Sequence, residues 1–373
     1  MKRIEWVDTI KAIGMIFVFY GHYVERISHI EGENGIAMMQ FKFIYSFHMP
    51  LFFILSGFFA KKKSDKKTYI KKLFFQRIIP VFSFAILFIP LWLMYFKYAY
   101  GYFHLDKIIN RGFSYLGGNP KLDFMTWFLV CLFTAELIAV LLGLLSNSKR
   151  ANLIKGLFLV TLGYLVIENI STYSSLKLNF WYIHESIIAL GFYLIGNWLF
   201  PILTKIKIEK RWLFFLLVPS ALLLMKLSNT FIENDSVVIM AISKHGDFLP
   251  FVINSLLGII LIISLGMIIP PNKIMSFIGN NTLILLGLNG VFFHFINSFV
   301  ANGTFNFDSW WIITINCILV SLISIAICYP IILFINKYLP QLFGKPYATG
   351  PILKPLNNYS LLRYVRKKDH VIE

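Results

Sequence analysis

Three ionisable side chains interrupt the first apolar stretch of the sequence, Asp8, Lys11 and His22. Ionisable groups at membrane depth are costly and by default mark a functional site. At about 100° per residue in a helix, Lys11 and His22 are roughly three turns plus 20° apart, and Asp8 lies on the same side. A rise of 1.5 Å per residue separates Lys11 from His22 by roughly 16 Å. The stripe therefore offers a cation near one end of the helix and a titratable base near the other.

The second apolar stretch adds another histidine. It opens with Phe47-His48-Met49-Pro50 and runs antiparallel to the first, which puts His48 at its outer end, level with His22. Two histidines at one depth on neighbouring helices favour a shared site. The alternative is structural, with Lys11 extended to the membrane surface and each histidine held by an interfacial neighbour.

Fewer polar side chains follow in the later apolar stretches. Glu185 follows His184 at the start of the sixth, where a carboxylate could orient or charge-match a histidine. Asn289 and His294 lie in the ninth, and His294 is more typical of a structural residue. The histidines show no zinc-ligand spacing, so we expect no metal site.

The elements that carry these residues are membrane helices. The chain of 373 residues is 57% hydrophobic and 14% charged, whereas soluble domains are nearer one quarter charged. No polar block could fold alone, so the prediction is an all-α polytopic membrane protein with one membrane domain over 1–335 and a basic tail over 336–373. Apolar runs long enough to cross a bilayer predict about ten transmembrane helices, near 10–28, 42–60, 79–98, 124–145, 153–170, 183–203, 211–228, 248–269, 280–300 and 309–335.

The net charge of +17 has its explanation in topology. With the N-terminus in the cytoplasm and ten spans, most of the 35 basic residues fall on the cytoplasmic side, as the positive-inside rule requires. Both termini are then cytoplasmic, and the protein is expected in the cell membrane, with the lipid bilayer as its surroundings. This distribution argues against a nucleic-acid partner. The three cysteines are scattered through apolar runs and predict neither a disulfide framework nor a zinc site.

Taken in order, these motifs resemble the acyltransferase 3 family of integral-membrane acyltransferases, and most of all its fucose 4-O-acetylase-like branch. The resemblance rests on Asp8-x-x-Lys11-x10-His22 and on Ser46-Phe-His48-Met-Pro-Leu-Phe-Phe-Ile-Leu-Ser-Gly57. Weaker matches follow in the same order: Arg77-Ile-Ile-Pro80, Trp127-Phe-Leu129, Glu185 to Gly196, and Phe277-Ile-Gly-Asn-Asn-Thr282.

The sequence departs from the family pattern at three positions. Lys11 stands where the family usually has arginine, which keeps the charge and loses the bidentate geometry. Phe74 stands where a second arginine commonly precedes Arg77, although Lys71 and Lys72 lie nearby. Asn289 stands where the ninth-helix motif often has histidine, which puts the role of that position in doubt.

The resemblance implies transfer of an acyl group, usually acetyl from acetyl-CoA, to a hydroxyl of a surface glycan or polysaccharide. It implies that His22 is catalytic and that basic groups near the cytoplasmic face serve the CoA. We therefore expect Lys11, Lys72 and Arg77 to meet the CoA phosphates and His22 to act as general base or, in a variant mechanism, to carry the acyl group. We expect His48 or Glu185 to assist His22 or bind the sugar, and Trp127 and Asn289 to contact the acceptor.

Under this hypothesis acyl-CoA is a co-substrate and no cofactor is bound permanently. Two other classes of function remain open from the sequence. Ten helices with buried polar groups would also suit a transporter of a glycan or a lipid-linked precursor, although no matched pair of broken helices marks an inverted repeat. A non-catalytic subunit of a surface-polymer assembly complex is the third. The sequence selects neither the acceptor nor acetyl over succinyl.

Overall fold

The computed structural model describes residues 4–32, 35–62, 65–173, 180–205, 209–230, 237–303 and 309–355. The described chain is an all-α polytopic membrane protein without strands. Nine of its helical spans are long and apolar enough to cross a membrane. The 27-residue helix α1 (Glu5–Glu31) is not among these nine, and it corresponds to the first of the ten predicted spans.

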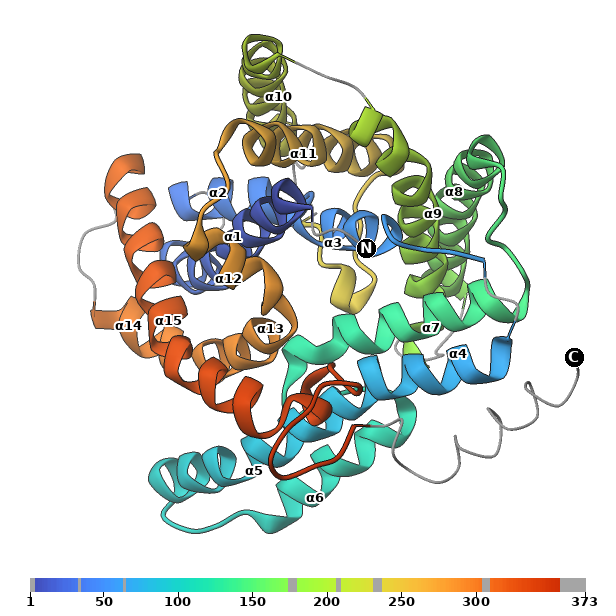
Figure 1. Cartoon of the computed structure of the whole chain (residues 1–373). Helices are drawn as coiled ribbons and strands as arrows, with labels where there is room; N and C mark the ends of the chain where they lie inside the picture. The colour runs from blue at the N-terminus through green and yellow to red at the C-terminus, as the bar shows by residue number, and fades with distance from the viewer. Residues whose placement is uncertain are drawn as a thin grey trace, which may run out of the picture.

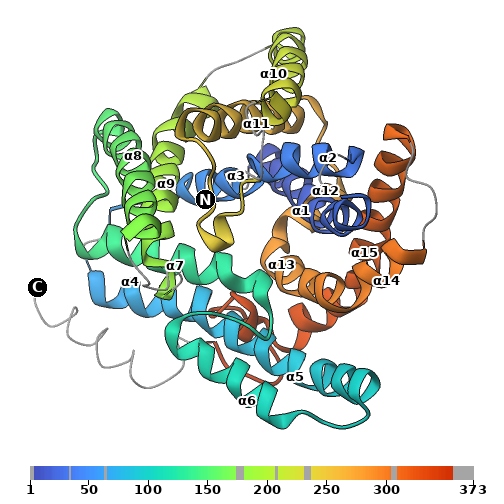
Figure 2. The same ribbon diagram turned by 180° about the vertical axis from the view of Figure 1, so that it is seen from behind.

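Helix α1 lies in the middle of the bundle. Figures 1 and 2 show it enclosed by other helices, and it contacts α2, α3 and α11 to α15. Most of its residues are buried, including Asp8 and His22. Because α1 faces protein on most sides, its polar groups escape contact with lipid, and an ionisable stripe becomes tolerable at this depth.

The second span is two helices, α2 (Ile36–Tyr45) and α3 (His48–Gly57), joined by a break at Ser46 and Phe47. The sequence prediction of 42–60 missed the first turns. His48 consequently lies in the middle of the 22-residue span rather than at its outer end, and its side chain is 3% exposed. The Ser46 hydroxyl donates to the Phe43 carbonyl and so satisfies a backbone group next to the break.

The third span begins earlier than its apolar run. Asp65 caps α4 (Lys66–Leu73) by accepting from the Thr68 backbone N–H at 3.0 Å. Hydrogen bonds from Thr68, its side chain first, hold the pKa of the exposed Asp65 below its usual range. A π-helical turn over Phe74–Ile78 then leads into α5 (Ile79–Tyr100). The basic segment between the predicted spans 42–60 and 79–98 is thus largely helical, and it puts Lys72 and Arg77 on one continuous helical segment.

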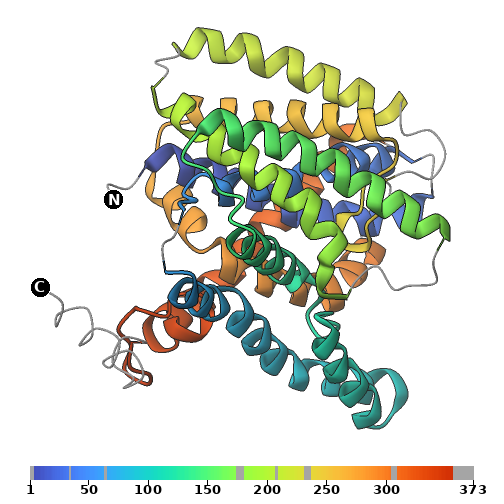
Figure 3. The same ribbon diagram turned by 90° about the vertical axis from the view of Figure 1, so that its right-hand side faces the viewer.

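The middle of the chain follows the predicted spans closely. The helices are α7 (Trp127–Leu141), α8 (Lys149–Tyr173), α9 (Ile183–Lys205), α10 (Lys210–Thr230) and α11 (Phe248–Ile268). A short amphipathic helix, α6 (Leu105–Phe113), lies between α5 and α7 and has no counterpart in the prediction. Figure 3 shows α10 along one edge of the bundle and the α5–α6 region projecting from the opposite edge.

The last third contains α12 (Lys273–Asn280), α13 (Thr282–Val291), a π-helical turn over Phe292–Ile296, α14 (Asn297–Gly303) and α15 (Trp310–Tyr338). The expected domain boundary at 335 falls inside α15. Beyond it, the 3-10 turn Pro340–Phe343 returns to the bundle, where Phe343 is buried against Phe84. The part of the predicted tail over 336–355 therefore packs on the membrane domain, and 356–373 lies outside the described residues.

Two glycines bring α3 and α9 into close contact. A Cβ on Gly57 would collide with the Tyr193 carbonyl, and one on Gly196 would collide with the Ile54 carbonyl. Small residues allow helices to approach in lipid, where packing rather than hydrophobic burial drives association. This contact fixes α3, and hence His48, relative to the rest of the bundle.

Candidate active site

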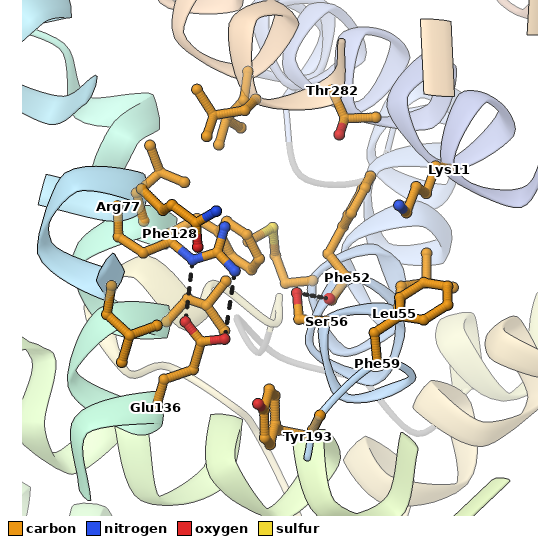
Figure 4. A pocket seen from close by; sticks show the side chains of 18 of the residues that line it. Lys11, Phe52, Leu55, Ser56, Phe59, Arg77, Phe128, Glu136, Tyr193 and Thr282 are labelled. Carbon is orange, nitrogen blue, oxygen red and sulfur yellow. Dashed lines mark hydrogen bonds and ion pairs between the residues drawn. The ribbon is translucent and has the colours of Figure 1, made fainter. Parts of the chain in front are cut away.

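A cavity of about 340 Å³ opens between α1, α3, α4, α7 and α13, and we call it the lysine cavity. Its lining includes Lys11, Lys61, Lys72, Arg77 and Glu136. Figure 4 shows Lys11 on one wall facing the Arg77–Glu136 pair across the cavity. The predicted donor-binding residues Lys11, Lys72 and Arg77, which come from separate parts of the sequence, thus line a single cavity.

Arg77 forms an ion pair with Glu136. Its Nε donates to Oε2 of Glu136 at 3.1 Å and its Nη2 to Oε1 at 3.4 Å. The Arg77 side chain is 24% exposed and that of Glu136 is 5% exposed. Two-point contact with a carboxylate neutralises much of the guanidinium charge and fixes its orientation. The excess of positive charge in the lysine cavity comes from Lys11, Lys61 and Lys72.

Two of these lysines, Lys11 and Lys72, lie near aromatic rings. The Lys11 ammonium lies 5.8 Å from the centre of the Phe59 ring, and the Lys72 ammonium lies 5.9 Å from that of Tyr347. Cation–π contacts at this distance attract an ammonium without consuming its hydrogen-bond donors. Both lysines can therefore still donate to an anionic ligand.

A second cavity, of about 60 Å³, adjoins the lysine cavity, and we call it the histidine cavity. His22 and His48 both line it, as do Trp127 and Tyr45. The two cavities share three lining residues, Val18, Met49 and Leu286. Two residues of the predicted α1 face thus line the cavities in turn, Lys11 the first and His22 the second, whereas Asp8 lines neither.

Asn289 sets the orientation of His22. Nδ1 of His22 lies 2.5 Å from Oδ1 of Asn289, and the Asn289 side chain is fully buried. A carbonyl oxygen can only accept, so Nδ1 carries the proton and donates it. The neutral imidazole then keeps its lone pair on Nε2, which is the form a general base requires. Asn289 lines neither cavity, and this geometry replaces its predicted acceptor contact with a positioning role.

His48 is held in the same tautomer by a different partner. Its Nδ1 donates to the Ile44 carbonyl at 3.0 Å, across the break between α2 and α3. Neutral His48 therefore also presents Nε2 as an acceptor. Tyr45 stands between the two histidines, with ring centres 6.2 Å from His22 and 4.6 Å from His48. The pair can bind two hydroxyl groups of one ligand.

Glu185 lies away from the cavity that His22 lines. It is fully buried in α9, lines neither cavity, and contacts Nε2 of His245 through both oxygens at 3.2 and 3.1 Å. The expectation that it orients His22 or binds the sugar is therefore not supported by its position. His294 also lies apart, where its Nε2 accepts from the Phe124 backbone N–H at 3.3 Å.

Sequence reasoning missed Glu25 as a member of the site. Glu25 lines the histidine cavity, and its Oε2 accepts from the Tyr45 hydroxyl at 2.7 Å. The signal was present, because Glu25 is three residues after His22 and so lies on the same helix face. The partnership of Arg77 with Glu136 had a similar signal, since both charges fall in or beside apolar spans.

Both π-helical turns deliver a side chain to a cavity. Arg77 of the first lines the lysine cavity, and Phe293 of the second lines the histidine cavity. Such turns re-aim side chains within a helix and are frequent at functional sites.

The sequence profile of the acyltransferase 3 family, described as an acyltransferase domain, matches residues 4–362. The chain belongs to this family. It is a multi-pass membrane acyltransferase, and the match covers every residue of both cavities. The match is to the family as a whole, so membership of the fucose 4-O-acetylase-like branch stays a prediction. No curated protein and no solved structure matches the chain.

Proposed function

We propose that the acyltransferase moves an acyl group, most simply acetyl, from cytoplasmic acyl-CoA to a hydroxyl of a glycan on the other side of the cell membrane. The observation that carries the proposal is the juxtaposition of the two cavities. One gathers cations suited to a nucleotide's phosphates, and the other holds a histidine whose tautomer leaves Nε2 as a base.

In this mechanism the CoA phosphates bind Lys11, Lys61 and Lys72, and the pantetheine arm extends along α1 toward His22. Lysines beside a low-dielectric wall attract phosphate strongly. Arg77 holds its place through Glu136 and has one terminal nitrogen, Nη1, left to donate to a phosphate or to the pantetheine amides. The rise from Lys11 to His22, roughly 16 Å, suits an extended arm carrying its thioester at the far end.

In the chemical step one proton is transferred through His22, and the thioester bond is replaced by an oxygen ester bond. Nε2 of His22 takes the proton of the acceptor hydroxyl while the oxygen attacks the thioester carbonyl carbon. The tetrahedral intermediate then collapses, the C–S bond breaks with its electrons on sulfur, and His22 returns the proton to the thiolate. The products are an O-acyl ester and free CoA. Asn289 holds the imidazolium through Nδ1, and His48 and Glu25 accept neighbouring hydroxyls of the acceptor.

The test is donor dependence in a purified system. The protein in lipid nanodiscs is incubated with acetyl-CoA and a glycan extract of the cells that make it, and free CoA and ester-linked acetyl are measured by mass spectrometry. We expect CoA release and ester formation to rise together and to require both substrates. Glycan movement across reconstituted vesicles with no acyl donor consumed would instead establish a transporter.

A further inference from the structure

The boundary between the two cavities is lined by aliphatic side chains. Val18 of α1, Met49 of α3 and Leu286 of α13 line both cavities, and we call these three residues the neck. All three side chains are at most 8% exposed. No other described residue lines both cavities, so a group passing from one to the other passes these aliphatic side chains.

The position of the neck follows from α1. Val18 is seven residues after Lys11 and four before His22, which puts it on the same helix face, roughly 10 Å from the first and 6 Å from the second along the axis. Met15, one turn below Val18, lines the lysine cavity, and Glu25, one turn above His22, lines the histidine cavity. The neck therefore stands directly before the base.

The space beyond the neck is small, and the nearby guanidinium of Arg26 lies over the Phe293 ring rather than in the lining. The histidine cavity holds about 60 Å³ against about 340 Å³ for the lysine cavity. Among the described residues no lysine or arginine lines it, while the Glu25 carboxylate does. A carboxylate on the transferred group would lose its water beside apolar and aromatic side chains, meet no lysine or arginine in the lining, and face Glu25, which is unfavourable on each count.

We infer that the neck selects the acyl group, admitting a short uncharged acyl such as acetyl and excluding longer or carboxylated ones. The inference rests on the proposed function and narrows its donor. Excess methylenes would collide with Val18, Met49 or Leu286, since a packed interior resists added volume. Discrimination by an apolar pocket is about tenfold or more for each methylene.

The test compares donors in the purified protein. Release of free CoA is measured with acetyl-, propionyl-, butyryl- and succinyl-CoA at fixed glycan extract, for the wild type, Met49→Ala and Leu286→Ala. In the wild type we expect kcat/KM for butyryl-CoA about a hundredfold below that for acetyl-CoA. Each variant should raise the butyryl-to-acetyl ratio about tenfold or more and leave succinyl-CoA rejected.

Leu55→Ala is the matched control. Leu55 lies on α3 with Met49, is also buried, and lines the lysine cavity but not the histidine cavity. It should change all donors by one common factor. If the larger truncations fail to insert, Val18→Ala and the narrowing change Val18→Phe replace them, and Val18→Phe should penalise propionyl-CoA more than acetyl-CoA.

The possible results distinguish a failure of the neck from a failure of the proposed acyl transfer. A wild type that consumes acetyl-CoA with a donor ratio that no neck variant moves would overturn the neck and leave the acyltransferase mechanism standing. Efficient use of succinyl-CoA by the wild type would overturn it as well. A wild type that consumes no acyl-CoA would overturn the proposed function, and the neck with it.

Discussion

At the scale of residues, the site depends on which nitrogen of His22 carries its proton. Asn289 settles this by accepting from Nδ1. An amide oxygen performs the orienting task without a charge, which suits a fully buried position in a bundle. The structure therefore gives Asn289, whose role the sequence left in doubt, a hydrogen bond to His22.

Asn289→Ala should lower kcat far more than it raises KM. Without an acceptor for Nδ1–H, His22 loses its fixed tautomer. Hydrogen-bond partners that orient metal-bound histidines in the same way are typically worth about 10 to 100-fold, and we expect a loss of that order. Steady-state CoA release measures the effect. Asn289→Asp and Asn289→His, which restore an acceptor, should recover part of the rate. A fall confined to KM would contradict the positioning role.

The sequence predicted the parts of the site that depend on spacing within one helix. The stripe of Lys11 and His22 on α1 is fixed by helix geometry, and the structure shows the same face along both cavities. Contacts between distant segments are not encoded in spacing. For that reason Glu185 was expected near His22 and instead contacts His245, and Glu25 was missed although its spacing from His22 was favourable.

At the scale of elements, the ion pair between the α4–α5 helical segment and α7 has a structural consequence. Removing one member leaves an uncompensated, largely desolvated charge, which costs about 3 kcal/mol or more. We expect Arg77→Met and Glu136→Leu each to lower the thermal unfolding temperature in detergent micelles.

The double variant Arg77→Met/Glu136→Leu should recover much of that stability, because neither charge is then left alone. It should still lose donor affinity. A double variant as unstable as the sum of its parts would show that the two side chains act independently.

The contact between α3 and α9 gives a second prediction at this scale. Gly57→Ala places a methyl group against the Tyr193 carbonyl, so α3 must shift and displace His48. We expect lower stability and lower activity together, measured by thermal unfolding and CoA release. Gly112→Ala is the control, since a Cβ there meets nothing within 4 Å, and it should leave both quantities unchanged.

The elements themselves were largely predictable. Nine predicted spans overlap the nine apolar helical spans, and the first corresponds to α1. Lys66–Leu73 lay outside the predicted spans because it is basic, and it is helical in the structure. Ile36–Gln40 was omitted although it is largely apolar. Hydropathy shows which residues face lipid or the protein core. It does not show where a helix ends, because a helix can extend beyond its apolar residues.

At the scale of the whole molecule, the proposed function requires the donor and the acceptor to approach from opposite sides of the membrane. The lysine cavity is next to the N-terminal half of α1 and the histidine cavity next to its C-terminal half. With the N-terminus in the cytoplasm, sealed inside-out vesicles should release CoA from externally added acetyl-CoA, and sealed right-side-out vesicles should not until permeabilised. Equal rates in both before permeabilisation would contradict this arrangement.

The central claim is that His22 is the base of an acyl transfer, and the most direct measurement is acetyl-CoA-dependent CoA release by purified His22→Ala. His104→Ala is the matched control, because His104 lines neither cavity and contacts Asp106. We predict that His22→Ala inserts and unfolds like the wild type and loses activity by about 1,000-fold or more, while His104→Ala keeps it. Full activity in His22→Ala would contradict the account.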